Sequence, residues 1–242
     1  MPALAGAARS FQEEIAMRFK QQLIAAAASI GLMSGAAQAA GVFDITGAKS
    51  ASTPIYSIAQ GQELLDGQIA HSSYLTGTAP VVNFEDPGNA GTKWHFGNKA
   101  PFIIDTPGVD NYFAIEATGT LVIPSGGNYT FGVNSDDGFS LTVGAFSLGS
   151  TGLKESSDVM QTFDFTKAGN YPINLYYFQA YGQAQVELYA TPGSYTTFGA
   201  AGSNFQLVNS PPSTGALQLV PEPGTATVLG MGAMFLLKRR RR

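Results

Sequence analysis

Short stretches in which apolar and polar residues alternate constrain the fold of this chain most. Residues 183–190 place Ala184, Val186 and Leu188 on one side and polar residues on the other. Residues 173–177 repeat the same spacing. A period of two is typical of β-strands with one buried face. The sequence therefore predicts strands that pack one face against a core.

The same period flanks the acidic tetrapeptide Ser135-Asp136-Asp137-Gly138. Asp and Gly tolerate positive φ, so this tetrapeptide is suited to a tight turn. We expect a hairpin in which residues 129–133 pair with residues 139–143. Two acidic residues at a solvated turn need no metal, and this interpretation stays open beside any binding role.

Further candidate strands are 112–116, 120–123, 159–165 and 205–208, separated by turn sequences that contain Gly or Pro. One short helix is expected at 58–66, with Ser57 as its N-cap and Gly67 just past its end. Many short strands with few helices predict an all-β single domain, an antiparallel β-sandwich of jelly-roll type. The chain has no cysteine, so this domain has to be stable without disulfides.

The N-terminus has the order of parts of a secretory signal peptide. Arg18 and Lys20 precede an apolar stretch at 23–37, which ends in the small residues Ala37 and Ala39. We expect cleavage between Ala39 and Ala40, which makes residues 1–39 a signal peptide. Residues 1–16 carry acidic side chains that do not suit such a signal, so we interpret them as a mis-assigned extension.

The C-terminus combines Val220-Pro221-Glu222-Pro223, an apolar run at 225–237 and a basic cluster at 238–242. A helix over that run would span roughly 20 Å, whereas a bilayer core is about 30 Å thick. The segment resembles the PEP-CTERM sorting signal of Gram-negative bacteria. That resemblance implies processing by a membrane protease, the exosortase, after transient association of the helix with the inner membrane. A plain C-terminal tail anchor or a frayed basic terminus is the alternative.

These segments divide the chain into a signal peptide (1–39), a β-sandwich domain (40–209), a linker (210–219) and a sorting signal (220–242). The part between the two signals, 40–219, holds five lysines, no arginine and 14 acidic residues, a formal charge of 5 − 14 = −9. A surface so poor in cations argues against nucleic acid as a partner. It suits an exported protein that meets cations or neutral sugars.

Several residue groups offer weaker hints of a site. His71 and His95 are the only histidines, so a zinc site would need carboxylates to complete it. Trp94-His95-Phe96 is either an aromatic strand near the core or a platform for a sugar ring. Glu85-Asp86 is either a solvated turn or a carboxylate pair for glycoside hydrolysis. We identify no catalytic residues and expect no enzyme.

Residues 127–143 have the sequence Gly-Asn-Tyr-Thr-Phe-Gly-Val-Asn-Ser-Asp-Asp-Gly-Phe-Ser-Leu-Thr-Val. This sequence resembles the signature of the protective-antigen-type domain, the PA-fourteen domain. Residues 110–124, 169–178 and 183–189 fit the strands around that signature. The resemblance covers roughly 110–190 well and 55–109 loosely. It implies a β-sandwich of a kind found in bacterial toxins, glycosidases and fungal adhesins.

In lectin-like members of that family, two adjacent aspartates are joined by a cis peptide and bind calcium, which holds sugar hydroxyls. By position, the resemblance assigns these roles to Asp136 and Asp137. It also implies a later asparagine ligand, for which Asn204 and Asn209 are candidates by location.

Two functions follow as expectations. The first is a secreted or cell-surface module that recognises an extracellular polysaccharide in the matrix with calcium at Asp136 and Asp137. The second is a structural component of the matrix or surface coat without a specific small ligand.

Overall fold

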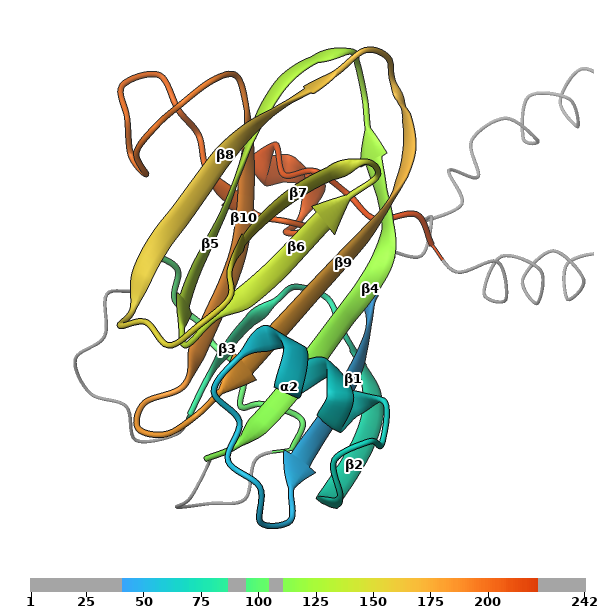
Figure 1. Cartoon of the computed structure of the whole chain (residues 1–242). Helices are drawn as coiled ribbons and strands as arrows, with labels where there is room; N and C mark the ends of the chain where they lie inside the picture. Colours follow the sequence, from blue (N-terminus) through green and yellow to red (C-terminus); the bar gives the residue numbers. More distant parts are fainter. Residues whose placement is uncertain (1–40, 87–94, 105–110, 222–242) are drawn as a thin grey trace, which may run out of the picture. The chain divides into compact units, whose positions relative to one another are not determined.

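The structure is a computed structural model and describes residues 41–86, 95–104 and 111–221. All of these residues lie in one compact unit, which begins at Ala40. Two antiparallel sheets face each other in a sandwich, and the described residues contain one short α-helix (Figure 1). This confirms the predicted all-β fold.

The larger sheet has six strands in the order β2-β1-β4-β9-β6-β7. Their bounds are β1 Phe43–Ser50, β2 His71–Ala79, β4 Phe113–Ile123, β6 Phe139–Val143, β7 Phe146–Ser150 and β9 Gly169–Gln179. The central strands β4 and β9 pair along eleven residues each, from Phe113 with Gln179 to Ile123 with Gly169. Residues 112–116 and 120–123, expected as two strands, thus belong largely to the single strand β4.

The smaller sheet has the order β11-β10-β5-β8, and β3 also pairs with β10. Its strands are β3 Asn83–Glu85, β5 Gly127–Asp136, β8 Ser157–Phe165, β10 Gln185–Pro192 and β11 Gln206–Leu207. The pattern at 183–190 predicted its buried face correctly, because Ala184, Val186 and Leu188 all lie in the core between the sheets.

Strands β5 and β6 do not form the expected hairpin. Phe131 of β5 pairs with Ala190 in the smaller sheet, whereas Leu141 of β6 pairs with Leu175 in the larger one. Both apolar sets point into the same core, but from opposite sheets. A period of two shows which face of a strand is buried but does not identify its partner strand. Because β5 and β6 lie in different sheets, residues 135–138 carry the chain from one sheet to the other.

The predicted helix is confirmed as α2, Ile58–Leu65. The Ser57 side chain accepts a hydrogen bond from the Gln60 N–H, and Gly67 takes a positive φ of 76° just after the end. The helix covers the outer face of the larger sheet, where a second apolar cluster includes Ala48, Ala114 and Phe178 (Figure 1).

Residues 210–219, expected as a linker, pack against the domain. Leu217 and Leu219 are buried in the core, and Leu219 forms a bridge with Leu121 of β4. Gly41 lies so close to Leu219 that an added Cβ would come within 2.7 Å of its backbone. The Pro- and Ser-rich composition suggested a spacer, but the two leucines give the segment apolar contacts that a spacer lacks.

The chain therefore enters and leaves the domain at the end of β4 that contains Leu121. At the other end of β4, Phe113 pairs with Gln179, beside the crossover between β5 and β6. The eight steps from Phe113 to Leu121 span about 26 Å at about 3.3 Å per residue. No helix among the residues described in the structure is long and apolar enough to cross a bilayer.

Candidate functional site

The crossover at Ser135-Asp136-Asp137-Gly138, called the tip below, joins the two sheets at the end away from the termini of the domain. The Asp136–Asp137 peptide bond is cis, as the family resemblance implied. Asp137 is only 6% exposed, and Asp136 is partly buried. The tip is therefore a packed element rather than a solvated turn.

Backbone N–H groups from two neighbouring loops bind the carboxylates of the tip. Asp137 Oδ1 accepts from the Lys154 N–H at 3.1 Å, and its Oδ2 accepts from the Ala180 N–H at 3.0 Å. The Asp136 carboxylate accepts from the Ser156 N–H. These bonds fix the tip between the loop that follows β7 and the loop at 180–184.

Burial perturbs the charges at the tip. Burial, followed by the negative charge of Asp137, raises the pKa of Asp136 to about 6. Burial also raises the pKa of Asp137, against the opposing hydrogen bonds from Ala180 and Lys154. Lys154 is half-buried beside them, and burial lowers its pKa to about 8 despite the nearby carboxylates. The carboxylates are therefore poorly compensated and would gain from further positive charge.

The oxygen atoms at the tip suit a hard cation such as calcium. Gln185 of β10 lies opposite Asp136 in the register, and its side chain is fully buried. Its Nε2 donates to Asn134 and Ser156, whereas its Oε1 is a buried acceptor without a hydrogen-bond partner. Asp136, Asp137 and this unpaired oxygen are the candidate ligands for such a cation; among the described residues no cluster of three or more His, Asp or Glu occurs.

Sequence reasoning did not find Gln185, because its place in an alternating strand predicted a solvent-facing side chain. The two asparagines that it proposed by location make their hydrogen bonds elsewhere. Asn209 binds Gly41, Pro80 and Leu219, and the Asn204 amide donates to Thr214. Neither has a hydrogen bond to the tip.

Exposed tyrosines lie next to the loop that binds Asp137. Tyr181 follows Ala180 directly and is 56% exposed, and Tyr56 is 44% exposed. The Tyr56 ring contacts Tyr112 and Tyr181 edge-on, with centroids 6.0 and 6.4 Å apart. Asn111 Oδ1 accepts from the Gly182 N–H at 3.3 Å. This tyrosine cluster, Tyr56, Tyr112 and Tyr181, gives the tip an aromatic border.

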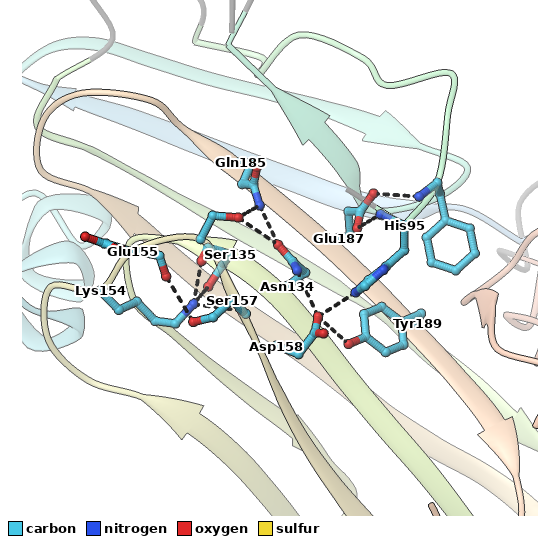
Figure 2. A network of polar contacts seen from close by, with 12 residues as sticks. His95, Asn134, Ser135, Lys154, Glu155, Ser157, Asp158, Gln185, Glu187 and Tyr189 are labelled. Atoms are coloured by element: carbon cyan, nitrogen blue, oxygen red, sulfur yellow. Dashed lines mark hydrogen bonds and ion pairs between the residues drawn. The ribbon is translucent and has the colours of Figure 1, made fainter. Parts of the chain in front are cut away.

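A second polar group lies on the outer face of the smaller sheet (Figure 2). His95 Nε2 contacts Asp158 Oδ1 at 2.7 Å, and the same oxygen accepts from Asn134 Nδ2 and the Tyr189 hydroxyl, each at 2.8 Å. The buried Glu187 accepts the N–H groups of His95 at 3.1 Å and Phe96 at 3.0 Å. This network fastens the segment around His95 to the sheet.

Charge and packing both indicate a structural role for this network. Burial raises the pKa of Asp158, but hydrogen bonds from His95, Asn134 and Tyr189 outweigh it, so the pKa lies below its ordinary value. Burial raises the pKa of Glu187. The His95 ring stacks on Phe198 with centroids 3.6 Å apart.

The structure places the other sequence candidates as follows. His95 and Phe96 pack beside Tyr189 outside any strand, and Trp94 lies outside the described residues. His71 is on β2 beside Tyr74, apart from His95. Glu85 forms an ion pair with Lys99 at 3.0 Å.

Only part of the targeting signals falls within the described residues. The Val220 N–H donates to the Thr120 carbonyl at 2.8 Å, and Pro221 is the last described residue. Glu222 and Pro223 of the sorting motif lie outside, as do Ala37, Ala39 and Ala40 of the signal cleavage site.

Comparison with known proteins gives one family match within the domain. Residues 103–200 match the family model described as the PA14 domain. This match includes the tip and the loop at 180–184, and it agrees with the resemblance found in the sequence. Residues 103–200 of the chain are thus similar to the PA14 domain.

Several solved structures resemble the chain. The PA14 domain of the antifreeze protein MpAFP has a TM-score of 0.48 and 16% identity, with 67% of this chain and 85% of that one covered. The PA14 sugar-binding domain from an RTX adhesin has a TM-score of 0.46 and 15% identity, with coverage of 66% and 96%. The A domain of epithelial adhesin 6 from Candida glabrata, in complex with Galβ1-3GlcNAc, has a TM-score of 0.45 and 14% identity, with coverage of 68% and 84%. A search of curated proteins gave no significant match.

Proposed function

We propose that this protein is a non-enzymatic module for glycan recognition or adhesion, and that its sugar binds at the tip. The observation that carries the proposal is a pair of carboxylates, the partly buried Asp136 and the buried Asp137, beside exposed tyrosines. Sugars present hydroxyls on their edges and apolar C–H groups on their faces. Carboxylate oxygens suit the hydroxyls, and aromatic rings suit the C–H faces.

Calcium belongs to this proposal, with Asp136 and Asp137 as the residues that would hold it and Gln185 Oε1 as a further oxygen donor. When bound, calcium supplies positive charge and coordination positions that vicinal sugar hydroxyls can fill. The protein itself orients the Asp137 carboxylate through the N–H groups of Lys154 and Ala180, and the Asp136 carboxylate through the Ser156 N–H. Tyr181, on the loop that Asp137 holds, supplies the ring on which a sugar would stack.

A glycan array with and without millimolar calcium tests this function. We expect binding by the wild type that chelator reduces, and a loss of roughly two- to twelvefold in affinity for Tyr181→Ala, the range for one lost aromatic contact. Asp137→Ala should bind weakly in both conditions. The matched control is Tyr74→Ala, because Tyr74 is 47% exposed on β2 and its ring contacts His71.

The array also separates the alternatives. Absence of glycan binding by the wild type would overturn the proposal in favour of a structural role in the matrix or surface coat. Binding that is equal in wild type, Asp137→Ala and Tyr181→Ala would place the sugar elsewhere on the domain.

We further propose that residues 1–39 direct export from a Gram-negative-type bacterium and that residues 220–242 direct sorting to the cell surface or matrix. An exosortase-type protease would be the partner for the second step. Mass spectrometry of the exported protein is expected to find Ala40 at the N-terminus and a chain that ends near Pro221-Glu222-Pro223. Surface protein that still carries the basic cluster at 238–242 would refute this route.

A further inference from the structure

Lys154 contacts the tip in two ways. Its backbone N–H donates to Asp137 Oδ1 at 3.1 Å. Its side chain turns back so that the ammonium donates to the Ser135 carbonyl, to Ser135 Oγ at 3.3 Å and to the Ser157 carbonyl at 2.9 Å. Figure 2 shows this side chain pointing at Ser135 and Ser157. The ammonium is therefore held as a bound cation would be, by oxygen atoms around it.

The position of Ser135 links this ammonium to the carboxylates. Ser135 directly precedes Asp136, and its hydroxyl donates to the Asp137 carbonyl at 2.7 Å. Lys154 is also the positive group that acts on both Asp136 and Asp137. Its charge reduces the formal charge of the two carboxylates from −2 to −2 + 1 = −1.

We propose that Lys154 is the resident cation of the tip, so that the domain folds without calcium and calcium binds against the charge of Lys154. This inference rests on the proposed calcium site at Asp136 and Asp137. With Lys154 in place, a bound calcium gives the group a formal charge of −1 + 2 = +1. Without it, the same ion gives −2 + 2 = 0. The lysine therefore stabilises the metal-free tip and weakens the affinity for the metal.

The test replaces Lys154 by methionine, which keeps an unbranched apolar stem and removes the charge. We expect the calcium affinity of Lys154→Met, measured by isothermal titration calorimetry, to rise roughly tenfold or more over wild type. That is the order expected for removing the repulsion between a single and a double positive charge at a protein surface. The melting temperature of the variant in chelator should fall, and millimolar calcium should restore it.

Lys167→Met is the matched control, because Lys167 is an exposed lysine that follows β8. It changes the net charge by the same amount, so its calcium affinity should stay within about twofold of wild type if the effect is local. Lys154→Arg keeps the charge and should keep the weak wild-type affinity. If Lys154→Met folds only with calcium present, that result also supports the inference.

Equal calcium affinity and equal melting temperatures for wild type and Lys154→Met would overturn the inference. Glycan binding separates this failure from failure of the proposed function. If the wild type binds sugar with calcium and Lys154→Met behaves identically, the role of Lys154 is refuted and the proposed function is not. A protein in which neither form binds calcium refutes both the role of Lys154 and the metal part of the proposed function.

Discussion

The side chain of Asn209 joins three segments of the domain that are far apart in sequence, and its removal should destabilise the fold strongly. Its Nδ2 donates to the carbonyls of Gly41 at 2.8 Å and Pro80 at 2.7 Å. Its Oδ1 accepts from the Leu219 N–H at 2.9 Å. Asn209 is only 7% exposed, so water does not readily replace these bonds after Asn209→Ala.

The size of the effect follows from these bonds and from the backbone. Three hydrogen bonds at a net value of about 1 kcal/mol each give about 3 kcal/mol. The φ of Asn209 is 69°, and alanine tolerates this left-handed region less well than asparagine does, which adds about 1 kcal/mol for alanine. We expect the free energy of unfolding to fall by about 4 kcal/mol in Asn209→Ala. Asn209→Gly should lose about 3 kcal/mol, because glycine accepts the positive φ but loses the same bonds.

Urea unfolding of the purified protein, followed by far-ultraviolet circular dichroism, measures these differences. Asn204→Ala is the matched control, since the side-chain amide of Asn204 makes only exposed hydrogen bonds, to the Thr214 carbonyl at 3.2 Å and from Gln206 Nε2 at 3.0 Å; it should change stability by less than about 1 kcal/mol. If Asn209→Ala is no less stable than Asn204→Ala, Asn209 does not hold the ends of the domain together. If Asn209→Gly is less stable than Asn209→Ala, the backbone part of the reasoning is wrong.

Two further predictions concern the outer face of the smaller sheet. Gly132→Ala should destabilise the domain by about 2 kcal/mol in urea unfolding, because the new Cβ would come within 2.2 Å of the Tyr189 ring. Gly97→Ala is its control, since no atom lies within 4 Å of the added Cβ, and equal stabilities would contradict the close packing of Tyr189. At a pH above its ordinary pKa, the ionised Asp158 side chain stabilises the folded state. This stability is lost as the pH falls through the lower pKa that Asp158 has in the folded state. Melting temperatures between pH 2 and 7 should therefore show Asp158→Asn less stable than wild type at neutral pH, with the difference vanishing in acid; a constant difference would refute the linkage.

The sequence predicted the buried faces of strands better than their partners. The alternation of apolar and polar residues correctly placed Ile173, Leu175 and Tyr177 in the core. Burial of one face of a strand produces this period of two whichever strand lies beside it. Pairing depends on contacts between distant segments. The adjacency of β5 and β6 in sequence therefore suggested a hairpin, although the two strands belong to different sheets.

The polar side of β10 shows why much of the site escaped prediction. Gln185 and Glu187 alternate with apolar residues as in a half-exposed strand, yet both are fully buried. Glu187 is covered by a segment around His95, 92 residues away in sequence. Lys154 reaches Ser135 from another loop. The family resemblance pointed to Asp136 and Asp137 as candidates, but local patterns hold no information on which distant segment comes to lie over a strand.

The bridge between Leu219 and Leu121 has a mechanical consequence. A domain tethered through the chain beyond Val220 and attached to a ligand at Asp136 and Asp137 would be pulled from opposite ends, along the direction of β4 and β9. The hydrogen bonds of these strands run perpendicular to that direction. Eleven residue pairs between β4 and β9 would then bear the load together, so the domain would resist shear as a unit instead of peeling apart one bond at a time.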